Sequence, residues 1–254
     1  MTFSIIGHCE LTGAFGGAIT TSDLAVGNRC LRLAHGKGAF LSQHRTDSRL
    51  GDAGIALLAD GQSAETAIQE VCATSPDIDW RQLGALDAHG QSAIYHGRRM
   101  YSVYSHSTAP GCLALGNILD NDQVTSAMAS AFASDSHLPL AEKLLRALEA
   151  GEQAGGEVAG MLKSAALQVT GEHGIATYDL RIDISEGHAT QDLRSLFDAY
   201  KGREKTLRDV ALCPDTVPVQ KALFEASIDR IEELGLVERF PTQEQRHNWT
   251  VAGE

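Results

Sequence analysis

The sequence predicts an α+β protein, a four-layer αββα sandwich of two antiparallel sheets flanked by helices, with a small C-terminal helical appendage. Two observations predict this class. Strand-like runs come in pairs joined by short turns, which is typical of antiparallel hairpins, and these pairs alternate with pairs of helices. The strand–helix–strand alternation of a doubly wound parallel sheet is missing. Two stacked sheets between helix layers satisfy this order of elements.

The first pair of strands opens the chain. Residues 2–7 are rich in β-branched and aromatic side chains, residues 10–13 read as a turn, and residues 14–21 form a second strand-like run. The short connection predicts an antiparallel hairpin. Because side chains alternate along a strand, one face is expected to carry Thr2, Ser4 and Ile6, and the other Phe3 and Ile5.

A third strand is expected over 38–43, and a first helix over 52–58. Ser63 is a candidate N-cap for a second helix. The apolar stripe of that helix predicts a buried face of Ala64, Ala67, Ile68 and Val71. A further hairpin is expected from 82–87 and 92–95, joined through His89-Gly90.

The second half of the globular region repeats this order. A strand over 112–117 precedes helices over 122–132 and 138–150, the latter with Gly151 as its C-cap. Strands over 164–169 and 177–184 and a helix over 191–200 complete the region.

The remaining chain reads as a separate appendage, so we expect domains at 1–202 and 203–254. Residues 201–210 are charged, lack apolar periodicity and look like a linker. One helix stripe is expected from Val219, Ala222, Leu223, Ala226, Ile231 and Leu234. Gly235 would end this helix and Leu236-Val237 would form a short strand. An oligomer contact and a lid are alternatives, but packing onto the core is the expected role.

Composition excludes several classes of function. The 254 residues carry a formal net charge of -12, which makes nucleic acid and anionic membrane poor partners. The five cysteines are scattered without CxxC spacing, so neither a disulfide framework nor a zinc site is expected. No apolar run is long enough to span a membrane, and no signal peptide is apparent. We therefore expect a cytoplasmic protein without a metal or other cofactor.

Several segments, in their order and spacing, resemble one family over about four fifths of the chain. The similar segments include Thr2-Phe3-Ser4-Ile5-Ile6, Gly61-Gln62-Ser63-Ala64, Gly116-Asn117-Ile118-Leu119 and Ser164-Ala165-Ala166-Leu167. From Met1 to about Tyr200 the chain resembles the bacterial "domain of unknown function 1028" proteins. The resemblance implies an N-terminal-nucleophile (Ntn) hydrolase-like αββα fold. The chain departs from the family pattern at Lys163, where Gln is usual, and in the loop after Gln43.

The implied chemistry uses one residue twice. The side chain of an N-terminal nucleophile attacks an amide, and its own α-amino group, with a pKa of about 7.7–8.0, accepts the proton. Thr2 is the candidate nucleophile, because removal of Met1 before a small residue would expose its amine. The alternative reading of Thr2 is an ordinary β-branched residue that begins a strand.

Other polar residues lie near the predicted strand ends and form the candidate substrate and oxyanion set. Ser22 and Asp23 would position the substrate or hold an amine. Gln43 or Asn117 would donate an amide N–H to an oxyanion. The set is Ser4, Ser22, Asp23, Gln43, His44, Asn117 and Lys163. Each has a structural reading as well, as turn chemistry, a satisfied polar group or a solvated lysine.

Three functions remain open at this stage. The first is an amidohydrolase that cleaves a small linear or cyclic amide through Thr2. The second is a non-catalytic protein of the same fold that binds a small metabolite or a protein partner. The third, a cysteine hydrolase using Cys9 or Cys30, ranks last because His8 and Cys9 would point to opposite faces of a strand. A homodimer or higher homo-oligomer is expected on general grounds.

Overall fold

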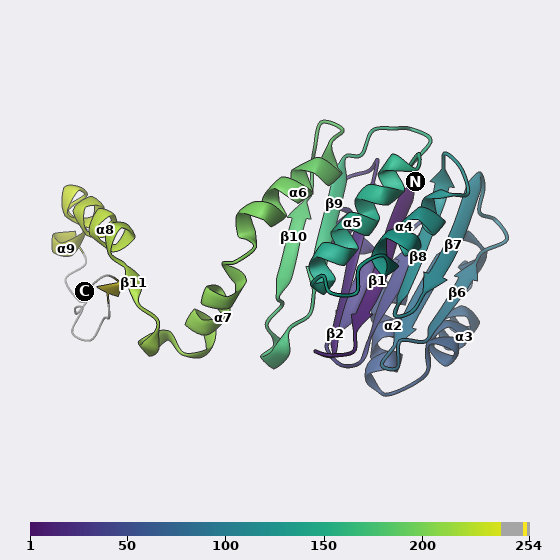
Figure 1. Ribbon diagram of the computed structural model, residues 1–254, viewed down its shortest axis with the longest axis horizontal. Coiled ribbons are helices and arrows are strands. Elements are labelled where there is room, and N and C mark those ends of the chain that lie inside the picture. The colour runs from purple at the N-terminus through teal and green to yellow at the C-terminus, as the bar shows by residue number, and fades with distance from the viewer. Residues whose placement is uncertain (240–250, 253–254) are drawn as a thin grey trace. The chain divides into compact units, whose positions relative to one another are not determined.

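The computed structural model describes residues 1–239 and 251–252. The chain divides into two compact units, Met1–Ala199 and Tyr200–Glu254, and each is described by itself (Figure 1). Within the described ranges, none of the helices combines the length and apolar character needed to cross a membrane.

The larger sheet of the first unit has six antiparallel strands in the order β10-β9-β2-β1-β8-β7. Its strands are β1 (Thr2–Cys9), β2 (Ala14–Thr21), β7 (Val103–Ala109), β8 (Cys112–Leu119), β9 (Ser164–Val169) and β10 (Tyr178–Ile182). The first hairpin forms the centre of this sheet, so the N-terminal strand is flanked by strands on both sides.

The smaller sheet has four antiparallel strands in the order β3-β4-β5-β6. They are β3 (Leu31–Ala34), β4 (Gly38–Gln43), β5 (Gln82–Asp87) and β6 (Ser92–His96). The strands β3 and β7 were not predicted, and both lie at sheet edges. β3 has only four residues, and β7 alternates polar side chains without a buried face, so neither carries a strong strand pattern.

The two sheets pack face to face through one apolar cluster. Ile6 and Ile19 of the larger sheet meet Ala39, Leu41 and Leu86 of the smaller sheet. The predicted alternation along β1 is confirmed, because Ile6 joins this inter-sheet core and Ser4 bonds across to Gln43 of β4, whereas Phe3 lies beside Gly151 of the outer helix α5 (Leu140–Gln153).

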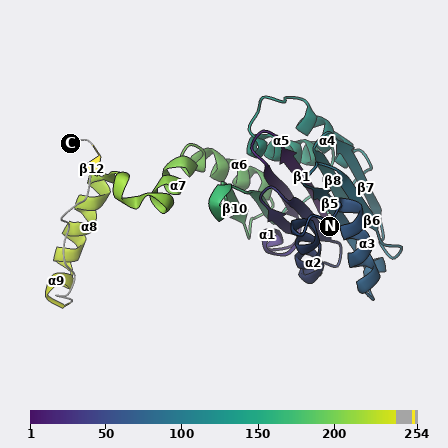
Figure 2. The same ribbon diagram turned by 90° about the horizontal axis from the view of Figure 1, so that it is seen from below.

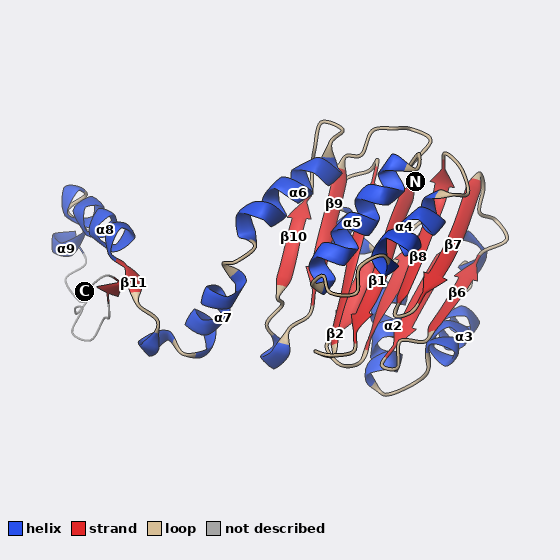
Figure 3. Ribbon diagram, viewed as in Figure 1, coloured by secondary structure: helices blue, strands red, loops and turns tan. Residues whose placement is uncertain are grey.

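Helices cover both outer faces of the sandwich, as Figures 2 and 3 show. α4 (Val124–Ala133), α5 (Leu140–Gln153) and α6 (Ala189–Tyr200) lie on the larger sheet. α2 (Ser48–Ala59) and α3 (Ala64–Thr74) lie on the smaller sheet, and the short α1 (Val26–Arg29) contacts β9. The αββα fold class predicted from the sequence is therefore confirmed.

The helix boundaries test the local predictions. Ser63 caps α3 by accepting a hydrogen bond from the Thr66 N–H, and the buried residues of α3 are the four that were predicted. α2 begins earlier than predicted, after the N-cap Asp47. The prediction that Gly151 ends α5 is wrong, since the helix continues to Gln153. Gly151 instead packs against Met128, where a side chain would have no room.

The C-terminal unit is helical in its described part. It contains α7 (Glu204–Leu212), α8 (Lys221–Glu233), α9 (Leu236–Arg239) and a short parallel pair of β11 (Val219–Gln220) with β12 (Val251–Ala252). The predicted linker over 201–210 is wrong, since α7 occupies most of it, and the predicted strand at Leu236-Val237 is helical. Gly235 follows α8 with φ +59°, as expected for a glycine that ends a helix.

Short 3-10 turns complete the described elements. They are Ile78–Trp80, Glu172–Gly174 and Pro214–Thr216.

Candidate functional site

One end of the sandwich gathers the polar residues that the sequence singles out. β1 begins there, β2, β4 and β8 end there, and β9 begins there, because each strand runs antiparallel to its neighbours. In the register of the larger sheet, Thr2 lies opposite Asn117 of β8, and the adjoining pair Phe3–Thr20 brings Thr21 of β2 beside Thr2.

Thr2 is buried, with 7% of its surface exposed. Its hydroxyl donates to the Met1 carbonyl and lies 3.3 Å from the hydroxyl of Thr21. Thr21 also donates to the Met1 carbonyl. The residue beside the predicted nucleophile is therefore Thr21, which the sequence analysis did not select.

Glu157 is a second residue that the sequence analysis missed. It lies in the loop after α5, is 3% exposed, and accepts hydrogen bonds from the Ser22 N–H at 3.1 and 3.2 Å. Burial raises the pKa of its carboxyl to about 7, against the opposing effects of the Ser22 bonds and the N-terminal ammonium. Gly155 and Gly156, with φ +127° and +61°, form a turn directly before Glu157. This glycine pair is the feature of the sequence that indicates a sharp turn at this point.

A network of hydrogen-bonded, buried side-chain amides connects the two sheets. The carbonyl group at one end of the network determines which amide atoms donate and which accept. The Gly116 carbonyl can only accept, so the amide nitrogen of Gln82 donates to it at 2.9 Å. The Gln82 oxygen then accepts from the amide nitrogens of Gln43 at 2.6 Å and Asn117 at 2.9 Å. The Gln43 oxygen accepts from the Ser4 hydroxyl at 2.9 Å.

Among the residues that the structure describes, nothing pairs with the Asn117 side-chain oxygen, although the residue is fully buried. An unpaired buried carbonyl is costly unless a ligand or a neighbouring donor completes it. Asn117 thus offers an acceptor. The amide nitrogens of Gln43 and Asn117, which were expected to donate to an oxyanion, are both engaged with Gln82.

His44 presents a second unpaired atom. Its Nδ1 lies 2.6 Å from the Trp80 carbonyl, which can only accept, so Nδ1 carries the proton and Nε2 is left as a buried acceptor without a partner. Burial lowers the pKa of His44, and the N-terminal ammonium adds to this effect. The backbone of His44 lies in the left-handed region, at φ +55°, which is unusual for a residue with a side chain.

The other candidate residues lie at the same end of the sandwich as Thr2 and the buried amides. Ser22 takes part through its backbone N–H. Asp23 forms an exposed ion pair with Arg29 at 3.2 Å. The Lys163 side chain is exposed, and its backbone N–H donates to the Thr21 carbonyl at 2.8 Å.

The two cysteines of the third hypothesis are not adjacent to a base within the described structure. Cys9 lies at the far end of β1, where His8 stacks on Phe15. Cys30 is buried, its thiol lies 3.4 Å from the Thr46 hydroxyl, and burial raises the pKa of this thiol. No group of three or more metal-ligating side chains was found among the described residues.

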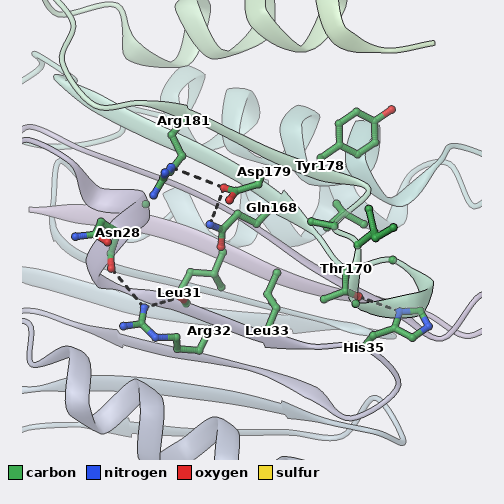
Figure 4. Close-up of a pocket in the computed structure, with 16 residues that line it drawn as sticks. Asn28, Leu31, Arg32, Leu33, His35, Gln168, Thr170, Tyr178, Asp179 and Arg181 are labelled. Carbon is green, nitrogen blue, oxygen red and sulfur yellow. Dashed lines mark hydrogen bonds and ion pairs between the residues drawn. The ribbon is translucent and has the colours of Figure 1, made fainter. Parts of the chain in front are cut away.

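The structure also has a pocket of about 460 Å³ along the open flank between β3 and the strands β9 and β10 (Figure 4). Its polar side chains bond mainly to one another. Gln168 donates to Asp179 at 3.0 Å, Arg181 lies 3.8 Å from the same carboxylate, and His35 lies 3.2 Å from the Thr170 hydroxyl. Thr2 does not line this pocket.

The chain is therefore an αββα sandwich protein whose central strand β1 begins with a buried threonine. This chain belongs to the family of unknown function DUF1028, whose model matches residues 2–193. The family resemblance drawn from the sequence is thus confirmed. None of the curated proteins matches the chain.

Solved structures extend this comparison. A crystal structure of a DUF1028 protein from Silicibacter pomeroyi has 33% identity and a TM-score of 0.72, and the match covers 78% of this chain and 88% of that chain. Anbu, an ancestral β-subunit, from Yersinia bercovieri matches at 9% identity and a TM-score of 0.38, over 78% of this chain and 93% of that chain. Anbu from Hyphomicrobium sp. strain MC1 matches at 13% identity and a TM-score of 0.39, over 78% and 95%. At such low scores the Anbu structures bear on neither the site nor the function of this chain.

Proposed function

We propose that this protein is an amidohydrolase that cleaves a small amide with Thr2 as an N-terminal nucleophile. The observation that supports this most is the set of unpaired buried acceptors at the start of β1. Asn117 lies opposite Thr2 in the sheet register, and the charge of the chain's amino terminus helps to lower the pKa of His44. Removal of Met1 would make Thr2 the first residue of the chain, and its amine, opposite Asn117 in the register, would supply a donor that these acceptors lack among the described residues.

The proposed reaction has two steps. The Thr2 Oγ1 attacks the amide carbon while the Thr2 α-amine accepts the hydroxyl proton, and this proton passes to the departing amine as the C–N bond breaks. Water then attacks the resulting ester, which releases the acid and restores the hydroxyl. Asn117 and Glu157 would orient the amine, since both offer acceptors on its side of the strand.

A non-catalytic binding role is the second candidate, and one observation favours it. With Met1 in place, its carbonyl accepts hydrogen bonds from both Thr2 and Thr21, so the two hydroxyls are already occupied. A chain that keeps Met1 has no free amine at Thr2, and the proposed reaction then lacks its base.

Intact-mass spectrometry combined with an amide-hydrolysis screen tests this proposal. Thr2→Ala keeps a small second residue, so Met1 removal continues while the attacking hydroxyl is lost. Thr2→Ser restores a hydroxyl. We expect a mass without Met1, turnover reduced by about 10³-fold or more in Thr2→Ala, and partial activity in Thr2→Ser.

The control is Thr108→Ala, which removes an exposed hydroxyl on β7 and should keep wild-type turnover. Undiminished turnover in Thr2→Ala would exclude Thr2 as the nucleophile. A retained Met1 without turnover of any amide would favour the binding role.

A further inference from the structure

Two arginines stand over one indole ring at the end of the sandwich that holds Thr2. The guanidinium of Arg45 lies 4.5 Å from the centre of the Trp80 ring, and that of Arg99 lies 5.5 Å from it. Tyr101 contacts the adjoining His44 edge to face, with ring centres 5.2 Å apart. We refer to Arg45, Trp80, Arg99 and Tyr101 as the arginine patch.

The backbone holds the arginine patch in place. The Arg99 N–H donates to the Asp79 carbonyl at 2.8 Å, and the Gly97 N–H donates to the Arg81 carbonyl at 2.9 Å, which fastens the loop after β6 to the segment before β5. Arg45 has φ +45° and follows His44, which is also left-handed. Two successive left-handed residues with side chains are a strained arrangement of the type found at functional sites.

The arginine patch carries two positive charges, those of Arg45 and Arg99. Two nearby arginines are paired, Arg49 with Asp47 at 2.7 Å and Arg98 with Asp79 at 3.2 Å. Within the part of the chain that the structure describes, Arg45 and Arg99 form no ion pair with a carboxylate. Their contact with the Trp80 ring leaves the guanidinium N–H donors available. The protein has a net charge of -12, but the two guanidinium groups over Trp80 make this part of its surface positively charged.

His44 connects the arginine patch to the candidate site. Its Nδ1 donates to the backbone of Trp80, its ring edge meets Tyr101, and its buried Nε2 is an unpaired acceptor near the chain's amino terminus. His44 therefore contacts the arginine patch and directly follows Gln43, which belongs to the buried amide network of the candidate site.

We propose that the arginine patch binds a carboxylate group of the substrate, so that the amide cleaved at Thr2 belongs to an anionic molecule. A planar carboxylate matches the forked donors of a guanidinium, and the flat ring of Trp80 holds the two guanidinium groups in place. This inference rests on the proposed function for the cleavage, but the binding of the carboxylate does not depend on turnover.

The test compares substrates that differ only in a carboxylate. One pair, glutaryl-p-nitroanilide and valeryl-p-nitroanilide, carries the charge on the acyl side. The other, 4-acetamidobenzoate and acetanilide, carries it on the amine side. We expect kcat/KM for the anionic member of at least one pair to exceed that of its neutral partner by about tenfold or more, through KM, and to decline at high salt.

The variants are Arg45→Gln with Arg99→Gln, and Arg49→Gln as the control with a paired, exposed arginine. The double variant should lose the preference for the anionic substrate and keep its activity on the neutral one, whereas the control should keep both. An equal rate on anionic and neutral substrates in the wild type, or an unchanged preference in the double variant, would overturn the proposal.

Direct binding separates this proposal from the proposed function. Calorimetric titration of the Thr2→Ala protein with 4-acetamidobenzoate and with glutaryl-p-nitroanilide requires no turnover. If no amide is hydrolysed but either anion binds, and binding is lost in the arginine variants, the patch is supported while the hydrolase fails. If neither anion binds more tightly than its neutral partner, the carboxylate site is excluded whether or not Thr2 is catalytic.

Discussion

Buried polar side chains at the start of β1 have more acceptors than donors. Among the described residues, Asn117 and His44 each leave one buried acceptor unpaired. Native interiors rarely keep such atoms without partners. A donor is missing at these atoms, and under the proposed function the amine of Thr2, freed by removal of Met1, would supply it.

The pKa of Glu157 gives a prediction about stability. Its carboxyl has an ordinary pKa near 4.5, raised by burial to about 7, so between these pH values the folded chain binds a proton that the unfolded chain has lost. The contribution of Glu157 to stability is therefore most favourable below pH 4.5, falls as the pH rises, and reaches its minimum above about pH 7. Glu157→Gln removes this dependence.

As the pH rises from 4.5 to 8, wild type should lose stability and Glu157→Gln should not. The difference in free energy of unfolding between variant and wild type should therefore change in favour of the variant, by about 3 kcal/mol at most. Denaturant titrations at several pH values measure this, on chains whose masses show that Met1 is retained. Glu70→Gln on α3 changes an exposed carboxyl and serves as the control. Parallel pH profiles for wild type and Glu157→Gln would contradict the prediction.

For single residues, the sequence indicates which residues belong to the candidate site better than it indicates which of them contact one another. Thr2 was selected because it follows Met1, and Ser4, Gln43, His44 and Asn117 because they lie near predicted strand ends. The structure brings all five to one end of the sandwich. Glu157 was missed because its burial depends on the loop after α5 folding back onto the end of β2. That contact joins residues 135 positions apart, so no local pattern reveals it.

Close contacts between elements depend on small residues at defined positions. On α2, a side chain at Gly54 would place its Cβ 2.3–2.5 Å from ring atoms of Phe40, which is fully buried in β4. At Gly51, one turn earlier, a Cβ would lie 3.2 Å from the Arg32 side chain, which is flexible. The same helix thus offers a tight position and a permissive one.

These two glycines give a matched prediction. Gly54→Ala should destabilise the protein by about 1–3 kcal/mol, because the Phe40 ring must move within a packed core. Gly51→Ala should be neutral or stabilise by up to about 1 kcal/mol, since alanine favours the helix. Thermal and denaturant unfolding of both variants provide the measurement. A Gly54→Ala variant as stable as wild type would show that α2 does not pack closely on Phe40 of β4.

Elements with a strong local pattern were predictable, and those defined by tertiary contacts were not. The apolar stripe and N-cap of α3 identify both its start and its buried face. β7 carries mostly polar side chains and exists as a strand because β8 pairs with it. α7 has an amphipathic pattern in a highly charged segment, and the charges outweighed it in the sequence analysis.

Across the whole molecule, burial is concentrated in the first unit. Every buried hydrophobic side chain among the described residues lies at or before Phe197, and Leu193 and Phe197 of α6 complete the core over β10. None of the described side chains from Tyr200 to Arg239 is buried. We therefore propose that residues 1–202 form an independent domain that contains the candidate site.

Truncation tests this division. A fragment of residues 1–202 should unfold cooperatively at nearly the temperature of the full chain, because it keeps the whole apolar core. A fragment that ends at Gly187 removes α6, uncovers Tyr178 and Leu180, and should lose several kcal/mol of stability. Circular dichroism melts of the two fragments and the full chain distinguish these outcomes. If the 1–202 fragment melts as poorly as the shorter one, the C-terminal unit supports the sandwich, and the boundary at 202 does not separate independent domains.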